Sequence, residues 1–425
     1  MVLTPERAGD ARQPVHTVYG GAQLFKPETP ARLGTLALEL IRNYTPDASS
    51  FAECLGLPHG ELADSVFART VAKLQREPVE DFRIDFEDGY GYRSDSEEDG
   101  HAVSTAQLLA QAAAKPGLPP FIGVRIKPFT EALRARSART LDLFFASFFH
   151  ESSSLPANFA ITLPKITSPG QVSEFVELLD AQETGHSLEP GALKIEFMIE
   201  TPQAIIDSSG SFAIPKLLET AQGRCRGLHF GPYDYSAACH IAAAEQRLDH
   251  PACDFARHVM QVCAADRGVS LSDGPSTILP IPPHRATPGG LLTEDQKAEN
   301  RIVVHRAMRH HFELVQRSLA HGYYQGWDLN PGQLPTRYAA VYAFFLKSLD
   351  LATTRLRNFI DKAAQATVAG NTFDDAATGQ GLLNFLLHGL NCGAFTEQEV
   401  AASGLTVVEL RSRSFPKIME SRRGR

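Results

Sequence analysis

The sequence predicts an α/β protein built on a (β/α)8 TIM barrel with a helical C-terminal extension, and two observations favour this fold class. Eight short apolar runs, rich in β-branched and aromatic residues, recur along the chain, and most are followed by a stretch with helical periodicity. Such strand–helix alternation is typical of a barrel of parallel strands. A doubly wound open sheet is the alternative, but it usually begins with a glycine-rich phosphate turn, and GGAQLF after the first run does not match G-x-G-x-x-G.

The apolar runs predict buried parallel strands, because each is closed by a polar or glycine cluster. In chain order we expect these strands at residues 15–19, 82–86, 121–126, 159–163, 193–199, 227–230, 269–272 and 323–329.

Helices are predicted between the strands. Ser168 is the expected N-cap of one of them, because it stands directly before Pro169, which suits the first helical position. The expected helices cover residues 31–43, 65–75, 102–114, 137–149, 169–180, 214–220, 251–267 and 293–320.

After Pro331 the pattern changes to helices alone. Residues 336–365 predict one long helix with apolar residues around most of its circumference, and residues 381–390 and 396–403 predict two more, the last opened by a Thr396/Glu399 capping box. We therefore expect a catalytic barrel over residues 1–335 and a helical region over 336–425.

The apolar surface of the predicted helix 336–365 must be buried by packing against other residues. A helix on the outside of a barrel normally keeps a polar stripe, which this segment lacks. We therefore expect part of it to pack against a second subunit, so that the protein forms a homo-oligomer.

Composition excludes several classes of protein. The 425 residues carry 41 Lys+Arg against 49 Asp+Glu, a formal net charge of −8, which argues against a broad nucleic-acid surface. No apolar run approaches about 20 residues, and MVLTPERAGD lacks the pattern of a signal peptide. The six cysteines include no CxxC pair, which favours reduced thiols over disulfides or a zinc ribbon. We expect a cytoplasmic protein that binds neither nucleic acid nor membranes.

Charged residues follow six successive predicted strands at intervals of about one βα unit. Because the C-terminal ends of barrel strands meet at one rim, these side chains are expected to line a common active-site mouth. They are Asp85, Glu87 and Asp88, then Arg125 and Lys127, then Lys165, Glu200, Asp234 and Asp273.

Glu200 and Asp234 are the predicted metal ligands. They end adjacent strands, and no His or Cys accompanies them, so the pair suits a hard cation such as Mg²⁺, with Mn²⁺ as an alternative. Either carboxylate alone is explained better as a cap of the following helix. Two carboxylates at matching positions, facing Arg125, favour the metal.

Arg125 is the predicted clamp for a substrate carboxylate, because its planar fork binds both oxygens. A salt bridge to Asp85, Glu87 or Asp88 is the alternative, and the two roles are compatible. Lys165 could act as a Schiff-base nucleophile only with a lowered pKa, and the nearby carboxylates predict the opposite. We expect Lys165 to act electrostatically.

The motifs DFED, GVRIKP, LPKI, MIET, FGPYDYSAA, SDGP and GYYQGWDLNPGQ, in this order, resemble those of the citrate lyase β-subunit superfamily. This superfamily includes the HpcH/HpaI-type class II aldolases and the malyl-CoA lyases, with malate synthase more distant. The resemblance covers roughly residues 15–333, and its motifs, each weak alone, are specific as an ordered set.

The resemblance implies roles for particular residues. Glu200 of the I-E-T motif and Asp234 of the F-G-x-x-D motif would hold Mg²⁺. Arg125 matches the arginine that binds keto-acid oxygens, and Glu87 and Asp88 match acids near the metal. The resemblance therefore assigns catalytic roles to Arg125, Glu87 and Asp88. It assigns substrate binding to Arg125, Lys165, Gly231 and Pro232.

This chain departs from the superfamily pattern in four places. HTVYGGAQLF replaces the opening R-S-x-L-F-x-P, and the segment between the first and second strands is long. GVRIKP replaces GVRIN, and Asn330-Pro331 stands where relatives have H-P. These loops help to bind the acyl-CoA or acyl-carrier arm in relatives, so the use of a CoA thioester is left open. The chain is an outlying branch on this evidence.

The activity implied is that of a Mg²⁺-dependent carbon–carbon lyase or aldolase. The substrate would be a small 2-oxo acid or a hydroxy-acyl thioester, reacting through a metal-stabilised enolate. The proton carrier is left open between Glu87, Asp88, a metal-bound water, His229 and a group from a neighbouring subunit.

Three other functions compete with this one. A malate-synthase-like transferase and a phosphoenolpyruvate-handling enzyme would use the same mouth. A non-catalytic metabolite-binding barrel is less favoured, because Glu200, Asp234 and Arg125 are all present.

Overall fold

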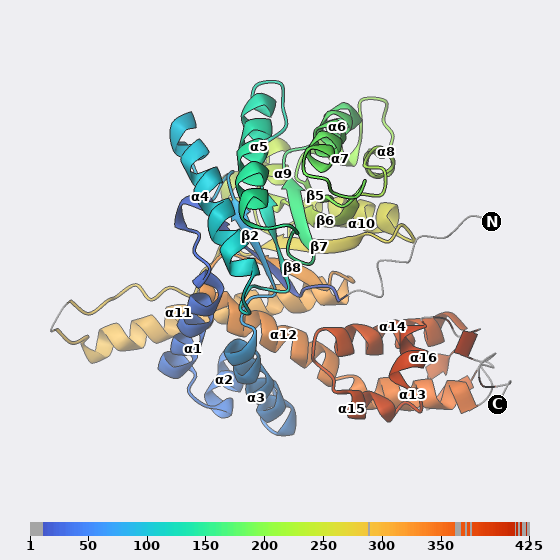
Figure 1. Cartoon of the computed structure of the whole chain (residues 1–425). Helices are drawn as coiled ribbons and strands as arrows, with labels where there is room; N and C mark the ends of the chain where they lie inside the picture. The colour runs from blue at the N-terminus through green and yellow to red at the C-terminus, as the bar shows by residue number, and fades with distance from the viewer. Residues whose placement is uncertain are drawn as a thin grey trace.

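The computed structural model contains a closed barrel of eight parallel strands in sequential order, which confirms the predicted fold class (Figure 1). The structure describes residues 12–287, 290–361, 367–369, 372–374, 376–412, 414, 417, 418 and 422. The eight strands are β1 His16–Gly21, β2 Asp81–Asp85, β3 Phe121–Arg125, β4 Phe159–Leu163, β5 Lys194–Ile199, β6 Cys225–Phe230, β7 Ser270–Pro275 and β8 Gln325–Asp328.

The strands lie where the apolar runs predicted them, with ends shifted by up to three residues. Every residue of β2, β3 and β4 is buried, as expected for strands covered on both faces. The strand register pairs Asp85 with Arg125 and Ile199 with Phe230, so the last residues of neighbouring strands lie side by side. The residues that follow the strands therefore meet at one rim of the barrel.

Helices surround the barrel and confirm the predicted alternation (Figure 1). Ser168 caps α6 as expected, accepting a hydrogen bond from the Gln171 amide. The helices after β1 to β4 are α1 Thr29–Tyr44, α2 Ala48–Leu55, α3 Glu61–Arg76, α4 Asp95–Ala113, α5 Arg134–Glu151 and α6 Pro169–Gly185. Those after β5 to β8 are α7 Pro202–Ile205, α8 Ile214–Thr220, α9 Pro232–Ala238, α10 Pro251–Ala264, α11 Glu294–Ala320 and α12 Leu334–Leu346.

The prediction of one helix over 336–365 is wrong. The segment forms two helices, α12 and α13 (Leu349–Asp361), with a break at Lys347 and Ser348, and residues 362–365 lie outside the described part. α12 packs against α11 and α3 and takes the position of the last barrel helix. The division of the chain at residue 335 stays a prediction.

The C-terminal helices cover the apolar faces of α12 and α13. They are α14 Ala376–Asn391, α15 Glu397–Ala401, with the predicted Thr396/Glu399 capping box, and α16 Val407–Arg411, next to a hairpin of β9 Thr367–Ala369 and β10 Thr372–Asp374. The Phe345 ring lies 5.1 Å from Phe385 and 5.7 Å from Phe395, centroid to centroid. The chain itself thus buries the face for which a second subunit was expected, and this argument for an oligomer is withdrawn. Homo-oligomerisation stays a prediction.

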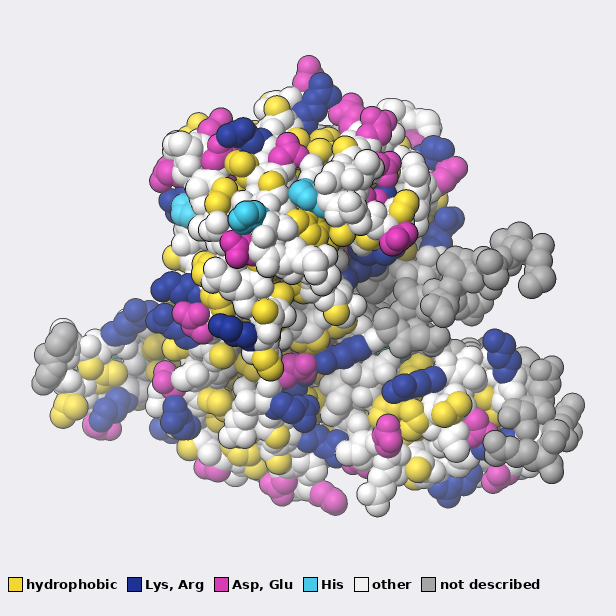
Figure 2. Space-filling model, viewed as in Figure 1, with side chains coloured by type: hydrophobic (Ala, Val, Ile, Leu, Met, Phe, Trp, Pro, Cys, Tyr) yellow, Lys and Arg dark blue, Asp and Glu magenta, His cyan; other side chains and the backbone are white. Residues whose placement is uncertain are grey.

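The molecular surface carries charges of both signs. On the face shown in Figure 2, acidic and basic side chains are interspersed. Among the described helices, none is long and apolar enough to cross a membrane.

Candidate active site

The candidate site lies at the rim where the strands end. Arg125 is the last residue of β3, Lys165 follows β4, Glu200 follows β5, and Asp234 lies in the first turn of α9 after β6. The predicted acids Glu87 and Asp88 follow β2. The structure brings these six side chains into one network of contacts.

Arg125 is buried and its fork is occupied. Its Nε and Nη2 atoms donate to Asp85 Oδ1 and Oδ2 at 2.7 and 2.5 Å. Nη1 forms an ion pair with Glu87 Oε2 at 3.0 Å but has no hydrogen-bond partner among the described residues. The predicted salt bridge therefore exists, and the edge of Arg125 left toward the mouth is the single nitrogen Nη1.

Two aromatic residues that the sequence did not single out complete the surroundings of Arg125. The Arg125 guanidinium lies 4.7 Å from the Tyr19 ring centroid and 5.4 Å from that of Trp327. Tyr19 Oη and Trp327 Nε1 are buried and make no hydrogen bond within the described part of the chain. Burial raises the pKa of Tyr19, so it remains a donor. The sequence signal that could have pointed to Tyr19 and Trp327 is their position in the first and last strands of the barrel.

Lys165 is held in a strained backbone conformation among the carboxylates. Its φ of 51° lies in the left-handed region, which is uncommon for a residue with a side chain. Its Nζ atom contacts Glu87, Asp88 at 3.3 Å and Asp234 at 3.7 Å. Burial opposes the charge, but Glu200 and Glu87 raise the pKa of Lys165 above its ordinary value. A charged lysine of this kind does not suit Schiff-base chemistry.

Glu200 is a buried carboxylate next to Lys165. Its side chain accepts a hydrogen bond of 2.7 Å from the Lys165 backbone amide. Burial raises the pKa of Glu200 to about 8, although Lys165 opposes the shift. A Cβ on Gly231 would lie 2.5 Å from Glu200 Cβ, so only glycine allows the turn before Pro232 to approach this closely. The same turn brings the half-exposed Asp234 to the site.

Glu200 and Asp234 fit a hard dication. Both contact Lys165: Glu200 accepts a hydrogen bond from its backbone amide, and Asp234 lies 3.7 Å from its ammonium group. Within the described residues, no three His, Cys, Asp or Glu side chains form a ready metal cluster. Two oxygen ligands with room for waters and substrate oxygens are the arrangement that Mg²⁺ accepts.

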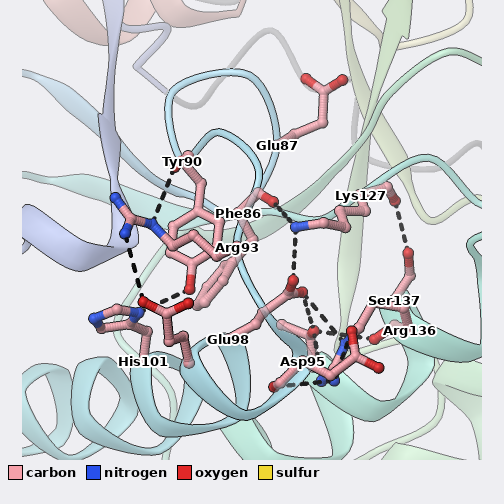
Figure 3. Close-up of polar contacts among 12 residues, drawn as sticks. Phe86, Glu87, Tyr90, Arg93, Asp95, Glu98, His101, Lys127, Arg136 and Ser137 are labelled. Carbon is pink, nitrogen blue, oxygen red and sulfur yellow. Dashed lines mark hydrogen bonds and ion pairs between the residues drawn. The ribbon is translucent and has the colours of Figure 1, made fainter.

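Lys127, where this chain departs from the superfamily pattern, anchors the loop that carries Glu87 and Asp88 (Figure 3). Its Nζ atom donates to the Phe86 carbonyl at 2.8 Å and pairs with buried Glu98 of α4 at 2.6 Å. The Ser137 hydroxyl donates to the Lys127 carbonyl at 2.9 Å. In Figure 3, Glu87 points away from this network, which therefore supports the loop from the side opposite its carboxylate.

Two residues considered from the sequence lie outside the site. Asp273 faces the helix layer, where it pairs with Arg257 at 2.9 Å and accepts from Ser318, because alternate residues of a strand point to opposite faces. His229 lies deeper in the barrel, 3.4 Å from Glu196, and burial lowers its pKa. The prediction that Asp273 lines the mouth is wrong, and His229 is removed from the proton-carrier candidates.

Comparisons with known proteins agree with this architecture. The family model described as a domain of unknown function (DUF6986) matches residues 5–418. No curated protein sequence matches this chain.

Solved structures similar to this chain include citrate lyase and malate synthase. A citrate lyase from Burkholderia xenovorans LB400 is 18% identical over 93% of this chain and 97% of its own, with a TM-score of 0.57. CitE from Mycobacterium tuberculosis, in complex with magnesium, acetoacetate and coenzyme A, is 15% identical over 90% and 99%, with a TM-score of 0.50. The Haloferax volcanii malate synthase magnesium/glyoxylate complex is 15% identical over 97% and 98%, with a TM-score of 0.47. The first two bear out, at the level of fold, the resemblance to the citrate lyase β-subunit superfamily.

Proposed function

The chain belongs to the DUF6986 family, and we propose that it is a Mg²⁺-dependent carbon–carbon lyase or aldolase that acts on a small 2-oxo acid through an enolate. One observation carries the proposal. The Nη1 atom of buried Arg125 is ion-paired with Glu87 but makes no hydrogen bond within the described residues, and it belongs to a carboxylate network that includes Glu200, whose pKa is raised by burial. The fold likeness to citrate lyase and to magnesium-bound CitE supports it.

The donors around Arg125 would bind the substrate carboxylate. Arg125 Nη1 and Trp327 Nε1 are buried donors without hydrogen-bond partners in the described structure, and an anionic oxygen would satisfy them. Asp85 fixes the guanidinium plane from behind, and the Tyr19 ring restricts its movement. The substrate is thereby oriented before reaction, which lowers the entropic part of the barrier.

Glu200 and Asp234 would hold Mg²⁺, whose charge would stabilise negative charge developing on the substrate's oxo oxygen. Glu87 is the better proton carrier of the two acids that follow β2. Burial raises the pKa of Glu87 despite Arg125 and Lys165, whereas contacts with Glu87 and Lys165 outweigh burial and lower the pKa of Asp88. A carboxylate with a raised pKa is better matched to proton transfer near neutral pH.

A malate-synthase-like condensation is the second candidate, and an apolar cavity favours it. The cavity, of about 190 Å³, lies beside Tyr19 and is lined by residues that include Leu24, Leu329 and Pro331. Its apolar wall would accept the arm of an acyl thioester. In this function a thioester would supply the enolate and a 2-oxo acid would accept it.

Steady-state assays distinguish the two candidates. Oxaloacetate and 2-oxo-4-hydroxy acids, with and without acyl-CoA, would be tested in the presence of Mg²⁺ and after chelation. We expect Mg²⁺-dependent cleavage that needs no thioester and that is lost in Glu200→Gln and Asp234→Asn. Turnover only with a thioester would favour the second candidate, and turnover unaffected by chelation or by either variant would contradict both.

A further inference from the structure

A large cavity lies at the opposite end of the barrel from the candidate active site, where the strands begin. Its volume is about 570 Å³, which suits a small-molecule ligand. The barrel wall consists of residues at or near the starts of strands, including Phe121, Asn158, Arg226 and Ser270. The other wall is α14, which in Figure 1 lies on the side of the C-terminal helices nearest the barrel.

One face of α14 presents amide side chains to the cavity. Gln380, Asn384 and Asn391, with His388 between them, recur at helical spacing and all line it. The leucines on the other face, Leu383 and Leu386, are fully buried. The Gln380 amide nitrogen donates to Asn384 Oδ1 at 3.0 Å, which orients the two carboxamides. A carboxamide carries both donors and an acceptor, which suits hydroxyl groups of a ligand.

Arg226 supplies the charged contact. Its Nε atom pairs with Glu196 at 3.0 Å, and Nη1 donates to the Asn158 carbonyl at 2.7 Å. The remaining nitrogen, Nη2, is buried and has no hydrogen-bond partner in the described part of the molecule. An anionic oxygen of a ligand would accept a hydrogen bond from this guanidinium nitrogen.

The charges of the lining favour a ligand with a single negative charge over a dianion. Arg12 also lines the cavity, but it is already paired with Glu77 and Glu80 at 2.6 and 2.7 Å. Glu196 is already paired with Arg226 and Arg83, and Asp266 adds negative charge to the wall. A phosphate ester, with about 1.5 to 2 negative charges at neutral pH, would be repelled more strongly than a carboxylate.

We propose that this cavity binds a small hydroxylated monocarboxylate, with its carboxylate on Arg226 and its hydroxyl groups on the carboxamides of α14. Tyr324 and His388, whose rings stack on each other with centroids 4.1 Å apart, also line the cavity and would contact the carbon skeleton. The site is separate from the mouth, because its wall is built from the opposite ends of the strands.

Calorimetry on the full chain tests the ligand class. The probes are D-gluconate, neutral D-glucose and the dianion D-glucose 6-phosphate. We expect gluconate to bind at least tenfold more tightly than either of the other two. Absence of gluconate binding, or tighter binding of the phosphate, would overturn the proposal.

Paired variants test the location. Arg226→Gln and Asn384→Leu should each weaken gluconate binding tenfold or more, whereas the exposed controls Arg247→Gln and Asn43→Leu should not change it. Asn384 lies on an exposed helix position, so its variant remains informative if Arg226→Gln fails to fold. Arg125→Lys should retain gluconate binding. Loss in Arg125→Lys, with retention in Arg226→Gln and Asn384→Leu, would assign gluconate to the barrel mouth and overturn the proposal.

Discussion

Glu200 combines nearly complete burial with a cationic neighbour, and the balance between the two makes its charge sensitive to pH. Its side chain is 2% exposed, and burial raises its pKa from 4.5 to about 8 in the absence of metal. Between these values the folded protein retains a proton that the unfolded chain has released. Stability of the metal-free protein therefore falls as the pH rises through this interval.

We expect thermal melts of the metal-free protein to show this loss. Each pH unit between about 5 and 8 costs up to about 1.4 kcal/mol from Glu200. Glu200→Gln has no titrating group at this position, so its melting temperature should decline less over the same interval. If the melting temperatures of the two proteins declined equally with pH, the pKa of Glu200 would be near its ordinary value and this prediction would be wrong.

Arg125→Lys tests the role of the Nη1 edge. Lysine keeps the charge but not the planar geometry, so affinity for a 2-oxo acid should weaken by about 1–3 kcal/mol, with Mg²⁺ affinity much less affected. Calorimetry measures both. The matched control is Arg224→Lys, because Arg224 is also buried and pairs with Glu183 next to the start of β6, at the opposite end of the barrel. An equal loss of ligand affinity in both variants would reduce Arg125 to a structural role.

Single residues could be predicted from the sequence where their chemical type and their spacing along the chain were informative. Glu200, Asp234 and Arg125 were identified because charged residues at strand ends recur at barrel spacing. The occupation of the Arg125 fork by Asp85 was open, because strand register decides it. Tyr19 and Trp327 were missed because an aromatic residue in a strand is usually a core residue.

At the scale of elements, the loop after β2 depends on contacts to a helix. Lys127 connects the Phe86 carbonyl to Glu98 of α4, and Glu98 also accepts from the Thr140 hydroxyl of α5 at 2.6 Å. The loop carrying Glu87 and Asp88 is therefore positioned by two helices as well as by its own strand.

Lys127→Met should release this loop. Loss of two contacts of a charged group should cost about 1.5–3 kcal/mol of stability and lower kcat more than it changes KM. Arg139→Met is the matched control, because Arg139 is 59% exposed and its pair with Asp99 should contribute about 1 kcal/mol or less. Denaturant melts and steady-state kinetics measure the two effects. A Lys127→Met enzyme with unchanged kcat would remove Lys127 from the positioning of the site.

Helices were predicted well where periodicity and caps agreed. Ser168 and Pro169 defined the start of α6, and the Thr396/Glu399 box that of α15. The break between α12 and α13 carries neither Gly nor Pro, so nothing in the local pattern marked it. α2 was missed although Asp47 and Ser50 form a capping box at its start.

At the scale of the whole molecule, the C-terminal helices replace the subunit contact that the sequence led us to expect. Tyr338, Tyr342, Phe345 and Phe359 are each at most 2% exposed within a single chain. Periodicity shows that a face is apolar but not which surface covers it, and this limited the prediction.

Leu386→Asp tests this packing. Leu386 of α14 is fully buried, so a carboxylate there should lower stability by several kcal/mol or leave the protein insoluble. Leu351→Asp on α13 is the control, because Leu351 is 61% exposed and its replacement should change stability by about 0.5 kcal/mol or less. Comparable melting temperatures for the two variants would show that α14 does not cover α12 and α13 in solution.

The central claim is that the mouth around Arg125, Glu200 and Asp234 promotes enolate formation from a 2-oxo acid in the presence of Mg²⁺. Exchange of the C3 protons of pyruvate or 2-oxobutyrate for deuterium, followed by NMR in deuterated water, measures this step without a second substrate. We predict exchange well above the buffer and Mg²⁺ background, which is lost on chelation and reduced at least a hundredfold in Glu200→Gln. Exchange at the background rate with the wild-type protein, or equal exchange in the wild type and Glu200→Gln, would contradict the claim.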